Sequence, residues 1–222
     1  MPDTFSRYSA LVASGAIEFD DAQASVARAL GALNDVLGER QMARKSSALG
    51  WLLGRGKPIM PPRGLYIWGD VGRGKTMLMD LFMAGSPVRA KRRAHFHEFM
   101  ADVHKRIHAR REEIKAHPKP SRGDEVIGPV AEDLANEATL LCFDEFSVTN
   151  IADAMILGRL FEKLFELGVV VVATSNVEPK RLYEGGLSRD LFLPFIDMLQ
   201  ERLEVLKLEA RTDFRLEKLS GQ

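Results

Sequence analysis

The chain has 222 residues, of which 45% are hydrophobic, and its 31 lysines and arginines equal its 31 aspartates and glutamates. This length and composition allow a sizeable buried core and exclude a wholly disordered chain. The balanced charge gives no overall field that would draw the chain to DNA or to an anionic membrane. A single cysteine, Cys142, excludes an internal disulfide framework and a CxxC metal site. The N-terminus has no apolar segment of the signal-peptide type, and the longest aliphatic run, Val169 to Ala173, is too short to cross a bilayer. We therefore expect a cytoplasmic protein without an integral membrane segment.

The first part of the chain is predicted to be helical, because residues 8–53 contain no proline. Asp20 and Asp21 can cap a helix. The apolar positions of that helix include Val26, Leu30, Leu33 and Leu37. Glycines and prolines between Gly54 and Pro62 then interrupt the pattern. The predicted organisation is an N-terminal helical arm (1–57), a core (58–210) and the start of a C-terminal region (211–222).

Strands and helices are predicted to alternate through the core. The predicted strands are Gly64–Trp68, Lys91–Phe96, Leu140–Phe143, Val169–Thr174 and Leu203–Leu208. The predicted helices are Met77–Met83, Met100–Lys115, Val130–Glu137, Ile151–Leu167, Pro179–Tyr183 and Phe192–Arg202. Because most of these strands are almost continuously apolar, they indicate an α/β fold with a five-stranded parallel sheet covered by helices on both faces.

The segment between the first strand and the first helix of the core matches the P-loop pattern G-x-x-x-x-G-K-[ST]. Glycines let the backbone aim its N–H groups at a phosphate, and the following helix N-terminus adds partial positive charge. Lys75 can reach the β and γ phosphates, and Thr76 can bind magnesium. The predicted nucleotide-binding residues are Gly69, Asp70, Val71, Gly72, Arg73, Gly74, Lys75, Thr76 and Met77. A chance glycine-rich turn is the alternative, and the strand and helix that flank the motif argue against it.

Two carboxylates, Asp144 and Glu145, follow the apolar strand at Leu140–Phe143. They are expected at the carboxyl edge of the sheet, where α/β proteins bind ligands. Asp144 can hold magnesium through water, and Glu145 can polarise a water for attack on the γ phosphate. Such a pair alone could equally cap a helix. Its position after a P-loop favours the Walker B interpretation.

Two further polar residues are predicted to serve the same site. Asn176 follows the next buried strand, where its amide can orient the attacking water; a simple turn is the alternative. Arg189 lies on a later loop and can stabilise the charge of phosphoryl transfer, within its own subunit or across an interface. Arg181 and Arg159 are weaker candidates for that role, and each of these arginines could be an ordinary surface residue.

For the histidines and the basic run Lys91–Arg93, we weigh binding roles against purely structural ones. His104 and His108 share a helix face, but their basic neighbours disfavour a metal ion and indicate a solvated surface. His95 and His97 are predicted at strand spacing, with structural hydrogen bonds or contact with the nucleotide or substrate as the alternatives. The run Lys91–Arg93 could contact nucleic-acid phosphates, but a solvated strand entry is favoured.

Taken together, these motifs resemble the ZapE family of AAA+ ATPases, which are bacterial cell-division proteins with mitochondrial relatives of the lactation-elevated type. The resemblance covers nearly the whole chain. It is carried by Gly64–Asp80, Lys91–Met100, Leu141–Phe146, Ile151–Leu157, Thr174–Asn176, Leu187–Arg189 and Phe192–Phe195. Departures are Ser147 and Asn150, which stand where a glutamine and an aspartate are expected and bear on partner contacts more than on hydrolysis.

The resemblance implies magnesium-dependent ATP hydrolysis, nucleotide-dependent self-association, and in bacteria an association with the FtsZ ring at the division site. In the mitochondrial branch it implies a link to protein quality control. It also implies that Lys75 and Thr76 bind nucleotide and magnesium, that Asp144 and Glu145 form Walker B, that Asn176 is sensor 1 and that Arg189 is the arginine finger. Family members carry a helical lid after the fifth strand. No lid is expected between Leu208 and Gln222, so we expect a fragment or a truncated form with weak activity.

The leading hypothesis is an ATP-hydrolysing AAA+ protein that remodels a protein partner. One alternative is a nucleotide-switched adaptor, in which binding drives assembly. Another is a nucleic-acid-acting ATPase of the helicase-loader type, which the neutral charge balance disfavours. A small-molecule kinase is disfavoured because no segment for binding an acceptor is evident. ATP and GTP are not distinguished by the sequence.

Overall fold

The computed structural model describes residues 3–50, 61–72, 74–117 and 126–209, with the side chains of 44–50 excepted. Its centre is a five-stranded, wholly parallel sheet in the order β2-β3-β4-β1-β5. The strands are β1 Gly64–Trp68, β2 Lys91–His95, β3 Leu140–Asp144, β4 Val170–Ser175 and β5 Leu203–Lys207. The predicted parallel sheet is therefore confirmed, with strand limits within one residue of those predicted.

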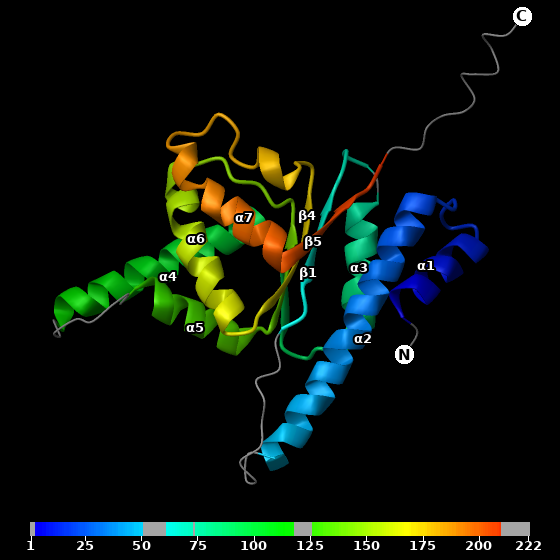
Figure 1. Cartoon of the computed structure of the whole chain (residues 1–222), viewed down its shortest axis with the longest axis horizontal. Coiled ribbons are helices and arrows are strands. Elements are labelled where there is room, and N and C mark those ends of the chain that lie inside the picture. Colours follow the sequence, from blue (N-terminus) through cyan, green and yellow to red (C-terminus); the bar gives the residue numbers. More distant parts are fainter. Residues whose placement is uncertain (1–2, 51–60, 73, 118–125, 210–222) are drawn as a thin grey trace, which may run out of the picture.

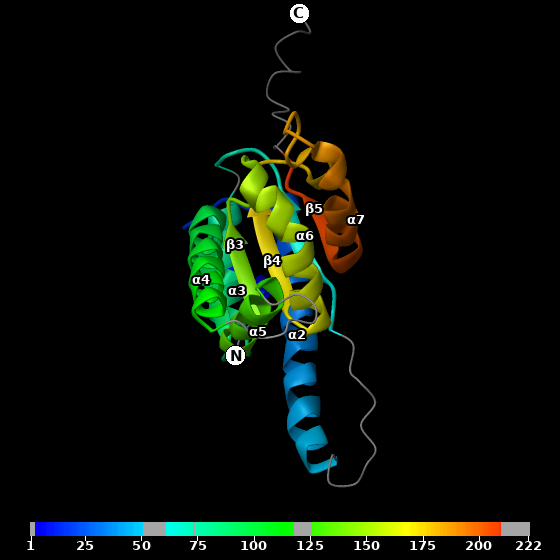
Figure 2. The same cartoon turned by 90° about the vertical axis from the view of Figure 1, so that its left-hand side faces the viewer.

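Helices cover both faces of this sheet (Figure 1). The helices are α1 Thr4–Ala13, α2 Asp21–Gly50, α3 Lys75–Gly85, α4 Phe96–Ala116, α5 Ile127–Glu137, α6 Ile151–Glu166 and α7 Leu193–Arg202. Two short 3₁₀ turns, η2 Pro179–Arg181 and η3 Arg189–Leu191, lie between β4 and α7. Figure 2 looks onto the face that α4–α7 cover.

The buried residues form two clusters because side chains alternate along each strand. Leu141 and Phe143 of β3 pack with α4–α7, whereas Leu140 and Cys142 of the same strand pack with α1–α3. A strand buried on both faces is apolar at every position, which is why the sequence showed continuous apolar runs.

The N-terminal part differs from the single helical stretch that was predicted. The helix breaks after Ala13, and Gly15 adopts a positive φ of 72° before α2 begins. The buried Tyr8 hydroxyl holds the turn: it donates to the carbonyl of Asp20 at 3.1 Å and accepts from the N–H of Asp20 at 2.9 Å. The predicted cap is confirmed, because the Asp20 side chain accepts from the N–H of Gln23. The four predicted apolar positions of α2 are buried in the cluster that also contains α3 and the sheet.

Three core helices begin earlier than predicted. Helix α3 starts at Lys75 instead of Met77. Helix α4 starts at Phe96, four residues before the predicted Met100, and α5 starts at Ile127 instead of Val130. Helix α4 follows β2 without a loop, so His97 lies in its first turn and not in a strand. The domain boundaries stay a prediction. Among the described residues, no helix combines the length and apolar character needed to cross a membrane.

Candidate functional site

The carboxyl ends of β1, β3 and β4 meet beside the N-terminus of α3, around a hollow of about 610 Å³. Its walls come from the loop after β1, the start of α3, and the ends of β2, β3 and β4. The lining residues are Val71, Gly72, Gly74, Lys75, Thr76, Met77, Arg93, His95, Asp144, Glu145, Thr174 and Asn176. The structure thus brings together five residues that the sequence singled out separately, namely Lys75, Thr76, Asp144, Glu145 and Asn176. Their chemical roles stay predictions.

The loop that forms one wall depends on glycine. Gly72 and Gly74 have φ angles of 79° and 83°, in the left-handed region that L side chains rarely adopt. Gly74 is the N-cap of α3 and offers no side chain to the first N–H groups of that helix. These N–H groups are therefore available to an anion at the helix N-terminus.

Lys75 begins α3 and its ammonium group turns back over the loop. The Nζ atom donates to the carbonyl oxygens of Gly69 at 2.6 Å and Asp70 at 2.7 Å. These bonds place the positive charge on the inside of the loop. Gly69 and Asp70 themselves do not line the hollow, and Arg73 lies outside the described residues.

Asp144 is the last residue of β3 and is 8% exposed, so its carboxylate sits at the floor of the hollow. Glu145 follows with a φ of 55°, a conformation that costs a non-glycine residue about 1–2 kcal/mol. The next residue is fixed, because the N–H of Phe146 donates to the carbonyl of Thr174 at 2.7 Å. The ring of Phe146 is fully buried among other aromatic side chains. This anchor keeps Glu145 in its turn at the mouth of the hollow.

Arg93 is a site residue that the sequence interpretation missed. From β2 its Nε donates to Oδ2 of Asp144 at 2.6 Å, and a terminal nitrogen donates to Oδ1 of the same carboxylate at 3.2 Å. The guanidinium also donates to Asp80 of α3. Burial alone would lower the pKa of Arg93, but the bonds to Asp144 and Asp80 outweigh it, so the pKa is raised and the charge is permanent.

The prediction of a solvated basic strand entry was wrong for the run Lys91–Arg93. The Lys91 ammonium donates to the carbonyls of Met83 and Ser86 at the end of α3, at 2.8 and 3.0 Å. Arg92 pairs with Asp102 at 2.8 Å. The side chains of Arg92 and Arg93 are only 29% and 23% exposed. Because successive side chains of β2 point to opposite faces of the sheet, the two arginines have different partners.

Asn176 directly follows β4, and hydrogen bonds of both neighbouring residues, Ser175 and Val177, fix the turn around it. The Ser175 hydroxyl donates to the carbonyl of Phe146 at 2.7 Å and accepts from the N–H of Val177 at 3.0 Å. The buried Tyr66 hydroxyl donates to the carbonyl of Val177 at 2.8 Å. These bonds link the ends of β1, β3 and β4, so the backbone on either side of Asn176 is held at a fixed place on the edge.

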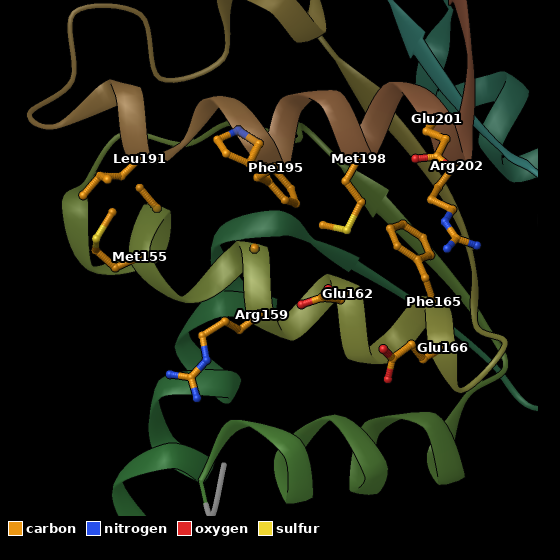
Figure 3. Close-up of a pocket in the computed structure, with 13 residues that line it drawn as sticks. Met155, Arg159, Glu162, Phe165, Glu166, Leu191, Phe195, Met198, Glu201 and Arg202 are labelled. Carbon is orange, nitrogen blue, oxygen red and sulfur yellow. The ribbon is translucent and has the colours of Figure 1, made fainter. Parts of the chain in front are cut away.

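None of the three candidate arginines lines the hollow. Arg189 begins η3 and donates to the carbonyl of Lys180 at 2.6 Å. Arg181 pairs with Glu184 in an adjoining hollow that shares Asn176 with the first. Arg159 lines a separate groove of about 550 Å³ between α6 and α7 (Figure 3). Arg189 therefore lies outside the hollow of its own chain, and its role stays a prediction.

The histidines occupy different environments. His95 ends β2 and lines the hollow, and the ring of His97 lies beside it at 5.8 Å between centroids. His104 is not simply solvated as predicted, because its Nε2 lies 2.6 Å from a carboxylate oxygen of Asp153. Asn150 caps α6 by accepting from the N–H of Asp153. The departure from the expected aspartate at 150 therefore preserves a helix cap.

A second, smaller hollow of about 390 Å³ continues from the glycine loop toward the turn between α1 and α2. The loop side contributes Gly72, Gly74 and Met77, and the N-terminal side contributes Ile17, Glu18, Asp20 and Gln23. The sequence interpretation assigned Asp20 a role as a helix cap but placed none of these N-terminal residues near the glycine loop. Only the tertiary packing of α2 against α3 brings them to the loop.

The family model described as AFG1-like ATPase matches residues 3–222. Lactation elevated protein 1 homolog B of Danio rerio is 52% identical over 159 residues, which are 70% of this chain and 31% of that protein. Cell division protein ZapE of Escherichia coli (strain K12) is 44% identical over 160 residues, which are 72% of this chain and 40% of that protein. The chain therefore matches less than half the length of either relative.

Among solved structures, a DNA replication initiation factor shares the fold, with a TM-score of 0.50 and 14% identity. The match covers 91% of this chain and 50% of that one. At this identity the likeness shows the fold alone. Together with the sheet order, it confirms the predicted α/β fold, in which helices cover both faces of a five-stranded parallel sheet.

Proposed function

Because the chain belongs to the AFG1-like ATPase family, we propose that it binds Mg-ATP at the carboxyl edge of its sheet and hydrolyses it to ADP and phosphate. One observation carries this proposal. A single hollow is lined by a glycine loop, a lysine, a hydroxyl, two carboxylates and an amide, which are the groups that phosphoryl transfer to water requires.

The proposed roles follow from position. Lys75 and the N–H groups at the start of α3 bind the phosphates. Glu145, at the mouth of the hollow, accepts a proton from the attacking water, and Asn176 orients that water. Arg189 acts on the nucleotide of a neighbouring subunit, because it does not line its own hollow.

The magnesium ion expected by resemblance fits the residues present. Thr76 and Asp144 both line the hollow and offer a hydroxyl and a carboxylate oxygen. Within the described ranges, no three or more histidine, cysteine, aspartate or glutamate side chains are grouped to hold a metal ion by themselves. Magnesium typically uses one or two carboxylates together with phosphate oxygens and water, so a sparse donor set suits it. When bound, it would neutralise phosphate charge.

We further propose that the base of the nucleotide occupies the smaller hollow beside the glycine loop. This hollow shares Gly72, Gly74 and Met77 with the larger one, so a nucleotide can extend from one into the other. Ile17 offers an apolar surface, and Gln23 offers an amide that can pair with a base edge. Substitution of Ile17 by Ala is expected to weaken binding of ATP more than binding of tripolyphosphate.

The central test is binding of a fluorescent ATP analogue and release of phosphate. Lys75→Ala is expected to weaken binding at least tenfold and to abolish turnover, since the ammonium charge inside the loop is lost. Glu145→Gln is expected to keep binding and to lose turnover about 100-fold or more. Lys115→Ala is the matched control, because that lysine is 72% exposed on α4. Unchanged turnover in Lys75→Ala would refute the proposal.

The cellular role is proposed from the relatives. A role in cell division is suggested by the likeness to ZapE, and FtsZ is the partner that the sequence resemblance implies. We propose that nucleotide binding drives self-association and that the assembled protein acts on this partner at the division site in the cytoplasm. Co-sedimentation with FtsZ polymers, with and without ATP, tests the partner. Sedimentation velocity of Glu145→Gln with ATP, compared with the same variant carrying Arg189→Ala, tests the assembly.

A further inference from the structure

Arg93 joins three elements of the site through two carboxylates. It lies on β2, and it contacts Asp144 at the end of β3 and Asp80 on α3. Asp80 follows Thr76 by four residues, so it lies one helical turn away on the same face of α3. The guanidinium thus links Asp144, one of the two residues proposed to hold magnesium, to a carboxylate one helical turn from the other.

Both oxygens of Asp144 are engaged by this arginine. Nε and a terminal nitrogen of Arg93 lie 2.6 and 3.2 Å from Oδ2 and Oδ1, respectively. A paired, charge-assisted arrangement of this kind is among the stronger hydrogen-bonding modes in proteins. A divalent cation and a guanidinium repel each other, so the carboxylate cannot keep this pairing and also serve the cation fully.

The second carboxylate differs in exposure. The side chain of Asp80 is 61% exposed, whereas that of Asp144 is 11% exposed. Asp80 is therefore an outer partner on which the guanidinium can remain while it releases the inner one.

We propose that Arg93 is a positioning residue that pairs with Asp144 in the absence of Mg-nucleotide and keeps only its contact with Asp80 when Mg-nucleotide binds. The pairing seen in the structure neutralises the charge of the nearly buried Asp144. Arg93 also competes with the metal for that carboxylate, and so sets how strongly magnesium and nucleotide binding are coupled. This inference rests on the proposed nucleotide-binding function.

Two other roles for Arg93 make different predictions. A purely structural pin between β2, β3 and α3 would affect stability but would not affect the coupling between metal and nucleotide. A direct ligand of the phosphates would strengthen nucleotide binding by the same factor with and without magnesium. The quantity that separates these roles is a ratio of two dissociation constants for one nucleotide. It is the constant measured in EDTA divided by the constant measured in saturating Mg²⁺, so a larger ratio means stronger coupling between metal and nucleotide.

The experiment measures this ratio with the non-hydrolysable, fluorescent analogue mant-AMPPNP and the 222-residue chain. Arg93→Gln is expected to raise the ratio about tenfold over wild type, because the competitor for Asp144 is gone. Arg93→Lys, which keeps the charge but loses the planar fork, is expected to give an intermediate value. Asp80→Asn is expected to lower the ratio about two- to threefold, because the guanidinium then has only Asp144 as a partner.

Arg92→Gln is the matched control, since Arg92 is the neighbouring arginine on β2 and pairs with Asp102 outside the hollow. Its ratio should equal that of wild type. If wild type binds the nucleotide and Arg93→Gln has the same ratio as wild type, the proposed role of Arg93 is overturned while the proposed function stands. Equal binding by wild type and Lys75→Ala would overturn the proposed function itself, and this inference with it. Folding of each variant is checked by urea unfolding with Mg-AMPPNP present.

Discussion

Tyr66 is the most informative place to test how the ends of the strands are held together. It lies in the middle of β1, its side chain is 0% exposed, and its hydroxyl donates to the carbonyl of Val177 at 2.8 Å. Val177 is the residue after Asn176. Substitution by Phe removes the hydroxyl but keeps the ring, which packs against Phe146 at 5.9 Å between centroids. The change therefore removes the bonds of the hydroxyl to the turn that carries Asn176 and keeps the packing of the ring.

The expected loss can be estimated from the environment of the bond. An intramolecular hydrogen bond contributes about 0.5–1.5 kcal/mol, and leaving a partly buried carbonyl without its donor costs about 1–3 kcal/mol. We expect Tyr66→Phe to lower the free energy of unfolding by about 1–2 kcal/mol. For a domain of this size that corresponds to a decrease in Tm of roughly 2–8 °C. Turnover is expected to fall several-fold as well, because the position of Asn176 becomes less fixed.

Urea unfolding followed by circular dichroism measures the stability change. Tyr183→Phe is the matched control, because the Tyr183 hydroxyl donates to the carbonyl of Leu187 at 3.0 Å but does not support Asn176. Both variants should lose a similar free energy, while only Tyr66→Phe should lose turnover. If Tyr66→Phe unfolds at the same urea concentration and with the same slope as wild type, the bond does not stabilise the sheet edge and the reasoning fails.

The same residue predicts a pH dependence. Burial raises the pKa of Tyr66 above its usual value of 10.0, an effect that a bond with Ser175 only partly offsets. The phenol is therefore harder to ionise in the folded chain than in the unfolded chain. Its contribution to stability is fully present below about pH 10 and is lost as the pH rises toward the higher folded pKa. The stability difference between wild type and Tyr66→Phe should shrink in that alkaline window and stay constant from pH 7 to about 9.

Three further outcomes are expected. Burial raises the pKa of the Cys142 thiol to about 12, so at pH 8 only about one thiol in ten thousand is ionised. Because the thiolate is the reactive form, iodoacetamide should label the native chain far more slowly than the chain in concentrated urea. Asn150→Ala should lower the free energy of unfolding by about 1 kcal/mol through loss of the α6 cap, and Asn150→Ser should restore most of it, as measured by urea unfolding. Gly74→Val should weaken mant-ATP binding more than tenfold, because a β-branched residue resists the φ of 83° at the start of α3. Gly128→Ala, where the added methyl meets open space, should leave binding unchanged.

The features that were predicted correctly depend on local signals. Continuous apolar runs identified the buried strands, and the glycine loop was recognised from its own spacing and its flanks. Asp144 and Asn176 could be placed at one edge because parallel strands bring their carboxyl ends together. The features that were missed depend on tertiary contacts. The partner of Arg93 is decided by the pairing of β2 with β3, in which Arg93 lies opposite Cys142 and His95 opposite Asp144.

The break between α1 and α2 was missed for a related reason. A proline-free stretch predicts helix throughout. Asp20 and Asp21 were recognised as a possible helix cap, but the local pattern did not show that a separate helix precedes them. The hydroxyl of Tyr8 bonds both backbone groups of Asp20, and this pairing closes the turn across twelve residues. This turn places Ile17 beside the glycine loop. The proposed base site therefore exists only in the folded chain and leaves no pattern in the sequence.

The charges around the larger hollow explain why the proposed ligand is Mg-ATP and not ATP alone. Among the described residues that line it, Lys75 and Arg93 contribute two positive charges, and Asp144 and Glu145 contribute two negative charges, so their sum is zero. In the structure Arg93 pairs with carboxylates, and Lys75 donates to loop carbonyls. A triphosphate without a cation would be attracted by the helix N-terminus and by Lys75, but it would be repelled by the carboxylates of Asp144 and Glu145. A divalent cation held by Asp144 would supply positive charge that offsets this repulsion. If this reasoning is correct, Asp144→Asn should strengthen binding of mant-AMPPNP in EDTA and weaken it in Mg²⁺, and a change of the same sign in both conditions would contradict it.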